Sequence, residues 1–257
     1  MTAMTATTAM TAIGRVVAID TSSAVTSAAL LVQGRLEGFA WHDDARGHLE
    51  ALSGLLAQVL GRPRAADLVV CGVGPGPYSG LRVGLATART LGLAWQVPVL
   101  GVCSLDAIAA AAVSSGTARQ GFSVAQDARR REEYRARYDA SGHRLAGPSI
   151  SAIQDRGPGP WFGSAAPGAQ AGPGGATFAE LRFPSAAWIA RIAFQALAAL
   201  PVSDVPRVVA EVLAQRPADL ARHGTDTGAT ERALTGHVLL PPRPLYVRRP
   251  DVHQGGR

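Results

Sequence analysis

The stretch GVGPGPYSGLRVGLATART, residues 72–90, decides how the first half of this chain folds. Three glycines and two prolines come before a run of small and apolar residues. Such a loop can cradle a phosphate, expose a nucleophile, or press a helix closely against another surface. Residue types and their spacing discriminate between these three interpretations.

The phosphate interpretation finds little support. Gly74, Gly76 and Gly80 are spaced GxGxxxG, whereas the dinucleotide fingerprint is GxGxxG with an acid about 20 residues later. The two prolines lack the N–H groups that a phosphate cradle uses. The helix start, with Arg82 close by, keeps some ability to attract an anion.

A nucleophile at Ser79 fits the sequence less well. A nucleophile elbow requires G-x-S-x-G, but Ser79 follows Pro77 and Tyr78 and precedes Gly80. No pair of a histidine with an acid is recognisable elsewhere in the sequence. We interpret Ser79 as the N-cap of the following helix.

Close packing explains the most residues of this stretch. Gly80, Gly84, Ala88 and Gly92 recur at i+4 and share one face of a helix. Each glycine costs about 1 kcal/mol of helix propensity, which packing must offset. This face packs either on the protein's own sheet or on a partner. The opposite side is apolar too, which predicts burial on both sides and favours a partner protein as a cover; it carries Leu81, Leu85 and Leu93.

The surrounding sequence gives the element order. Residues 15–20 (RVVAID) form a buried strand, and a hairpin turns at Gln33-Gly34. The apolar spacing predicts a helix over 46–60, and the glycine-rich stretch joins a further strand to a second helix. Another strand follows, and Ser104 is the N-cap of a third helix. The order strand, strand, strand, helix, strand, helix, strand, helix is that of actin-like and ribonuclease-H-like domains.

The second half is less regular. Residues 119–140 predict two strands, in the second of which Tyr134, Ala136 and Tyr138 alternate with charged residues. We expect a hairpin turn at Ser141-Gly142, a loop at 156–175, a helix at 184–200 and no clear element at 201–237.

Composition excludes some functions. All 25 basic residues are arginine, and the absence of lysine excludes a Schiff-base enzyme and a phosphate loop of the GxxxxGK type. The net charge of +6 permits a nucleic-acid partner. Cys71 and Cys103 lie in apolar runs, so we expect core residues in a reduced, cytoplasmic compartment. We expect neither a signal peptide nor a membrane span.

Four segments together resemble one family. They are AIDTSS, the stretch GVGPGPYSGLRVGLATARTLGLAWQVPVLGVCSLDAIA, AQDARRREEYRARYD and LYVRRPDV, and they look like the TsaB (YeaZ) family of tRNA threonylcarbamoyladenosine biosynthesis. The specific block runs from Gly74 to Gly84. The resemblance is strong over 15–140, weak over 145–240, and returns at the last segment.

The resemblance implies an α/β fold of two actin-like (ASKHA, ribonuclease-H-like) subdomains with mixed sheets flanked by helices. We expect them at 14–118, which would bind the partner, and 119–250. Disordered tails would occupy 1–13, with three alternative start methionines, and 251–257.

The family also implies a function. Its members are non-catalytic scaffold and dimerisation subunits that support TsaD, the catalytic subunit, and TsaE, an ATPase, joins them. TsaD adds threonylcarbamoyl to N6 of the adenosine next to the anticodon of ANN-reading tRNAs, so tRNA is an indirect partner. TsaB binds TsaD, or a second copy of itself, through a helical face of its N-terminal subdomain. Here that face would hold Leu49, Leu52, Leu56, Tyr78, Gly80, Leu81, Gly84, Leu85, Ala88 and Gly92.

An enzyme remains the alternative. An ASKHA-type phosphotransferase would act through Asp20 and Asp127, which follow the first strands of the two subdomains, with Thr21 beside the first. ATP or ADP with Mg²⁺ at a complex interface is the one cofactor that we leave open. An acid that caps the turn after a strand is the commoner role of such an aspartate.

Three further features complete the expectations. His42 and His48 are six residues apart, so they lack the i, i+4 spacing of the H-x-x-x-H metal pair that TsaD carries, and we predict no metal. Without that pair or a nucleophile site, a peptidase is disfavoured. The run from Arg129 to Arg131 either contacts tRNA phosphates or forms a solvated hairpin edge.

Overall fold

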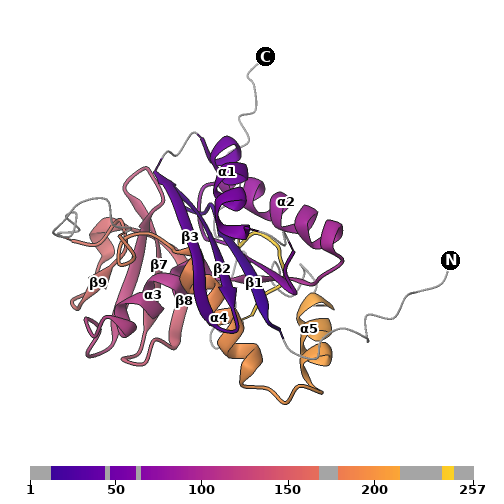
Figure 1. Cartoon of the computed structure of the whole chain (residues 1–257). Helices are drawn as coiled ribbons and strands as arrows, with labels where there is room; N and C mark the ends of the chain where they lie inside the picture. The colour runs from indigo at the N-terminus through magenta and orange to yellow at the C-terminus, as the bar shows by residue number, and fades with distance from the viewer. Residues whose placement is uncertain (1–12, 44–46, 62–64, 168–178, 215–238, 246–257) are drawn as a thin grey trace.

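Two mixed sheets form the centre of the molecule (Figure 1). The structure is a computed structural model that describes residues 13–43, 47–61, 65–167, 179–214 and 239–245. Apart from Ile13, the two predicted tails lie outside the described residues, as do most of the LYVRRPDV segment and most of the stretch 201–237.

The first sheet has the strand order β3-β2-β1-β4-β5. β1 pairs antiparallel with β2 and parallel with β4, so the sheet is mixed. The elements of this half are β1 (Arg15–Asp20), β2 (Val25–Val32), β3 (Arg35–Asp43), α1 (His48–Leu60), β4 (Leu68–Gly72), α2 (Tyr78–Trp95), β5 (Val99–Val102) and α3 (Ser104–Ser114).

The second sheet has the order β8-β7-β6-β9. Its β6–β7 and β7–β8 pairs are antiparallel, and β9 adds to β6 in parallel. The elements of this half are β6 (Phe122–Asp127), β7 (Glu132–Tyr138), β8 (Arg144–Ala152), a 3₁₀ turn (Ile153–Asp155), β9 (Trp161–Phe162), α4 (Ala186–Ala198) and α5 (Val205–Ala214).

The structure confirms the predicted fold class and the predicted element order of the first half. Gln33 and Gly34 both have positive φ, at 49° and 75°, as a tight hairpin turn requires. The helix expected over 184–200 spans Ala186–Ala198. The sequence did not predict α5.

Two predicted helix caps are wrong. α2 already begins at Tyr78, so Ser79 lies inside the helix and makes no capping hydrogen bond. α3 begins at Ser104 itself, and Cys103 occupies the cap position. The Ser104 hydroxyl instead donates a hydrogen bond to Asp20, which belongs to a distant part of the sequence.

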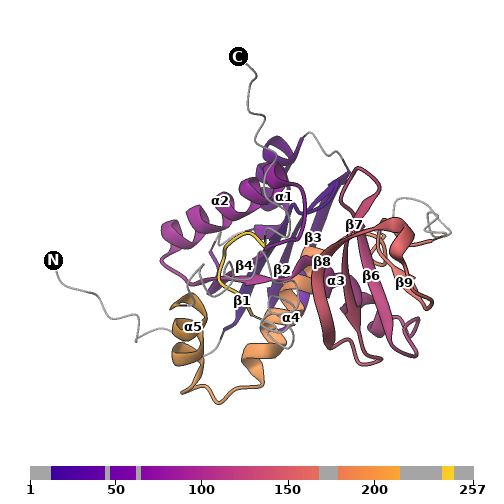
Figure 2. The ribbon, with the colours of Figure 1, turned by 180° about the vertical axis from the view of Figure 1, so that it is seen from behind.

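Helices cover both faces of the first sheet (Figures 1 and 2). Val17 and Ile19 of β1 face α1 and α2, whereas Val16 and Ala18 face α4 and α5, because successive side chains of a strand alternate. α3 packs against α4 and the second sheet. The predicted subdomain division at 118/119 stays a prediction, and α4 and α5 return from the second half to cover the first sheet. None of the described helices is long and apolar enough to cross a membrane.

Glycines surround the segment that follows β1. An added Cβ would lie 1.8 Å from an Asp20 carboxylate oxygen at Gly72 and 2.0 Å from the Ser22 carbonyl oxygen at Gly76. At Gly80 and Gly84 it would lie 2.3 Å from the Thr21 carbonyl oxygen and hydroxyl, respectively. The small residues of α2 therefore let the chain after β1 pass directly beneath the helix. These four glycines are Gly72, Gly76, Gly80 and Gly84.

Gly84→Ala is expected to destabilise the protein by about 2 kcal/mol, because the new methyl group overlaps the buried Thr21 hydroxyl. The matched control is Gly54→Ala in α1, where a Cβ meets nothing within 4 Å. That control should gain about 1 kcal/mol from helix propensity. Urea denaturation of both variants checks the prediction, and equal stabilities would contradict it.

Candidate functional sites

Asp20 is sealed inside the protein with an exposure of 0%. Its carboxylate accepts hydrogen bonds from the Ser22 backbone N–H at 2.9 Å, the Ser22 hydroxyl at 2.8 Å and the Ser104 hydroxyl at 2.7 Å. Burial raises the pKa of Asp20 from 3.8 to about 6, although these hydrogen bonds act in the opposite direction. Ser104 also accepts a bond from the Gly74 N–H, so Asp20 anchors the glycine-rich loop.

Asp20 therefore has the geometry of a turn-capping acid. Its bond from the Ser22 N–H is that of an Asx turn, and Gly72 leaves no room beside the carboxylate. Thr21 is buried, and its hydroxyl donates to the Gly80 carbonyl oxygen at 2.7 Å. Asp127, the other predicted acid, is exposed and pairs with Arg129 at 3.4 Å. In this conformation, neither Asp20 nor Thr21 offers an open ligand position to Mg²⁺ or a nucleotide.

The raised pKa of Asp20 predicts a specific pH dependence of stability. The folded state binds this proton more tightly than the unfolded state, so the resulting stabilisation is present below about pH 4 and lost as the pH rises through 6. The shift corresponds to about 3 kcal/mol. Denaturation of wild type and Asp20→Asn should show that wild type loses about this much relative to the variant between pH 4 and pH 7. Parallel curves would contradict the prediction.

Most of the predicted partner-binding face lies inside the folded chain, and its role in binding a partner stays a prediction. Eight of the ten residues are buried by the chain itself, because this side of α1 and α2 faces the first sheet and the segment after β1. Leu49 and Tyr78 are exposed and keep the predicted role open. The buried residues are Leu52, Leu56, Gly80, Leu81, Gly84, Leu85, Ala88 and Gly92.

The outer faces of α1 and α2 make a different surface, which we call the α1–α2 outer face. Leu49 is 70% exposed and Leu93 is 82% exposed, the highest values among large apolar side chains of the described residues. The two helices contact each other, and each also exposes several small residues. This face was not predicted from the sequence, although the helical repeat of small residues on α1 is a pattern that could have indicated it. Its members are Leu49, Ser53, Gly54 and Ala57 on α1 and Ala86, Thr90, Leu93 and Ala94 on α2.

His42 and His48 contribute to no metal centre in the described part of the chain. His48 is the first residue of α1, and its buried Nδ1 lies 2.5 Å from the Thr26 hydroxyl oxygen. His42 is exposed on β3. Among the described residues, no group of three or more His, Cys, Asp or Glu side chains is placed to hold a metal ion. Cys71 and Cys103 are buried, and burial raises the pKa of both thiols to about 12.

The β6–β7 turn, residues 128–131, has an unusual backbone. Arg129, Arg130 and Arg131 have φ values of 64°, 56° and 62°. Each non-glycine residue in this left-handed region costs about 1 kcal/mol. The Arg129 N–H donates to Asp127 at 2.8 Å, and the Glu132 N–H donates to the Arg129 carbonyl oxygen at 3.0 Å. These bonds hold three exposed arginines in a strained conformation.

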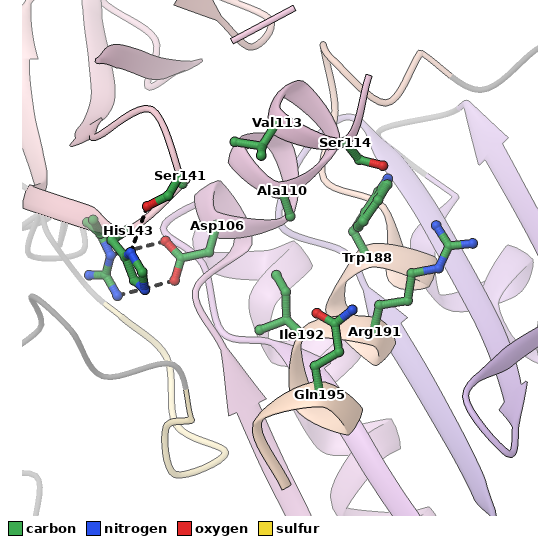
Figure 3. A pocket seen from close by; sticks show the side chains of 12 residues that line it. Asp106, Ala110, Val113, Ser114, Ser141, His143, Trp188, Arg191, Ile192 and Gln195 are labelled. Atoms are coloured by element: carbon green, nitrogen blue, oxygen red, sulfur yellow. Dashed lines mark hydrogen bonds and ion pairs between the residues drawn. The ribbon is translucent and has the colours of Figure 1, made fainter. Parts of the chain in front are cut away.

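A pocket of about 590 Å³ lies between α3, α4 and the β7–β8 turn (Figure 3). At one side Asp106 accepts hydrogen bonds from the Tyr138 hydroxyl at 2.8 Å and from Arg144 at 3.3 Å. At the other side the Arg191 guanidinium lies 4.7 Å from the centre of the Trp188 ring. The buried Asp106–Arg144 pair joins the first half of the chain to the second sheet.

Ser141, His143 and Asp139 lie together in the β7–β8 turn, but they do not form a catalytic triad. The Ser141 hydroxyl donates to Asp139 at 2.6 Å and lies 2.8 Å from His143 Nδ1. The same Nδ1 lies 3.7 Å from Asp139, whereas a triad histidine uses one ring nitrogen for the serine and the other for the acid. These three residues form a hydrogen-bonded turn at the surface, in which Ser141 and His143 are exposed and Asp139 is half-buried.

Asp106→Asn is expected to destabilise the protein by about 3 kcal/mol, because Arg144 would remain as a buried charge without its carboxylate. Asp155→Asn, at an exposed position, is the matched control and should change stability by less than about 0.5 kcal/mol. Urea denaturation midpoints measure both. A loss below about 1 kcal/mol in Asp106→Asn would show that the pair is not needed.

The fold and the site together define an actin-like α/β protein with two sheets. In it, Asp20, the acid that ends the first strand, is buried. Residues 25–238 match the family described as TsaD: tRNA N6-adenosine threonylcarbamoyltransferase. The chain belongs to this family. It is 41% identical over 154 residues to the protein Rv3421c of Mycobacterium tuberculosis, covering 58% of this chain and 70% of that protein.

Other relatives match in part. A tRNA N6-adenosine threonylcarbamoyltransferase of Methylorubrum extorquens is 39% identical over 67 residues, which cover 24% of this chain and 19% of the enzyme. The solved structure of YeaZ from Pseudomonas aeruginosa matches with a TM-score of 0.58 and 27% identity, covering 75% of this chain and 97% of that chain. A structure described as similar to the peptidase YeaZ, from the same organism, has a TM-score of 0.53, 26% identity and coverage of 59% and 76%. These structures confirm the predicted resemblance to TsaB (YeaZ).

Proposed function

We propose that this chain is a TsaB-type, non-catalytic accessory subunit of a tRNA threonylcarbamoyladenosine-forming complex. It supports a TsaD-type subunit that transfers threonylcarbamoyl to N6 of the adenosine next to the anticodon of ANN-reading tRNAs, and a TsaE-type ATPase joins them. Similarity to YeaZ and to the TsaD family supports this role.

The α1–α2 outer face is the observation that carries the proposal. Leu49 and Leu93 expose apolar side chains on neighbouring helices, and exposed small residues on the same two helices permit close approach of another helix. The inner faces of α1 and α2 already pack against the first sheet, so docking of a partner on the outer faces need not rearrange the core. A second copy of the chain is the competing occupant of the same face.

The phosphotransferase alternative has weaker support. Asp20 is enclosed by Ser22, Ser104 and Gly72, and its pKa is raised rather than lowered. An acid that orients Mg²⁺ works as an open carboxylate. A scaffold function uses the same acid to hold the loop that leads into α2.

Leu93→Asp is expected to weaken binding to the TsaD-type subunit of the same organism by about tenfold or more, because it replaces the most exposed apolar side chain of the proposed contact with a charge. Gly54→Arg should act similarly, because its Cβ meets nothing within 4 Å and the side chain projects from α1. Both variants should retain the wild-type circular dichroism spectrum and melting temperature. Light scattering and titration calorimetry of the mixtures measure binding.

Leu145→Asp is the matched control, since Leu145 is exposed on β8. It should bind like wild type. Absence of any complex with wild type overturns the proposed function. A complex that tolerates both Leu93→Asp and Gly54→Arg moves the docking site elsewhere, and a wild-type homodimer lost in the same variants identifies the second copy as the occupant.

A further inference from the structure

We propose that the β6–β7 turn contacts the sugar-phosphate backbone of tRNA through Arg129, Arg130 and Arg131. This inference rests on the proposed function, because it identifies the RNA as the tRNA substrate of the complex. It goes beyond that function by giving this chain a direct contact with RNA.

The backbone of the turn is the first support. Arg129, Arg130 and Arg131 are consecutive non-glycine residues with positive φ, a conformation that glycine adopts without strain. Hydrogen bonds at both ends hold it, from the Arg129 N–H to Asp127 and from the Ile153 N–H to the Arg131 carbonyl oxygen. The strained backbone therefore lowers stability at positions that place charged side chains at the surface. Such strain is often found in functional segments.

The charge of the turn is the second support. All three arginines are exposed, and the Arg129–Asp127 pair lies in solvent, with side-chain exposures of 73% and 48%. Such a pair is weak and easily exchanged for a phosphate. In the described part of the chain, Arg131 forms no ion pair with a carboxylate. Elsewhere, Arg144 and Arg156 are largely buried and bound to Asp106 and Glu133.

The arrangement fits a polymer better than a single small anion. Successive residues of a tight left-handed turn are rotated by about 100°, so three consecutive side chains spread apart rather than converge on one ligand. A nucleic acid offers several phosphates to such a spread. Residues 127–133 contain no aromatic side chain on which a base could stack. The contact is therefore expected to be independent of base sequence.

The test compares Arg131→Gln with Arg207→Gln, which removes one charge from an exposed arginine on α5. Each variant, in the complex with the TsaD-type subunit, is titrated with an unmodified transcript of an ANN-reading tRNA, by fluorescence anisotropy at several salt concentrations. Arg131→Gln should weaken binding about three- to sixfold at 0.1 M salt and reduce the slope of log K against log salt by about 0.7–0.9. Arg207→Gln should leave both unchanged.

Arg131→Gly separates charge from backbone conformation. It should lose tRNA affinity like Arg131→Gln while its melting temperature stays equal to or rises above that of wild type, because glycine relieves the strain. Equal affinities of wild type and both Arg131 variants overturn the inference, as do equal losses in the Arg131 and Arg207 variants. If no complex forms, the proposed function fails, and the same titrations of the chain alone still decide whether the turn contacts RNA.

Discussion

The buried carboxylate of Asp20 is the interaction on which the first half of the structure depends. It joins the end of β1 to the start of α3 through Ser104, and Ser104 in turn holds the glycine-rich loop at Gly74. A carboxyl group without solvent is costly unless hydrogen bonds surround it. The glycines at 72, 76, 80 and 84 follow from the same constraint, because side chains there would displace the segment that carries the acid.

This constraint also separates the two sides of α2. The small residues on the inner side contact the segment after β1, so this close packing occurs within the chain itself. The outer side carries Leu93 and a second set of small residues that nothing in the described structure covers. The same residue types therefore have two roles, internal packing on one side of the helix and the proposed docking of a partner on the other.

The first strand of each sheet ends in an aspartate that caps the following turn, but the two turns differ in burial and charge. Asp20 ends β1 and Asp127 ends β6, and each accepts a hydrogen bond from the backbone N–H two residues later. At Asp20 glycines and serines enclose the turn, which leaves a buried, hydrogen-bonded anchor. At Asp127 the turn is exposed and carries three arginines in a strained conformation. Burial in the first case and charge in the second assign a structural role to one turn and a proposed contact role to the other.

The sequence by itself determined the element order of the first half, the hairpin at Gln33-Gly34 and the resemblance to TsaB, because these depend on local periodicity, turn residues and motif spacing. Tertiary structure decided which side of a helix is free. An i+4 row of glycines and alanines looks the same whether it meets its own chain or a partner, and only the position of Thr21 beneath Gly84 shows that this row is internal. The role of Ser104 likewise depended on Asp20, 84 residues away, which no local pattern relates to it.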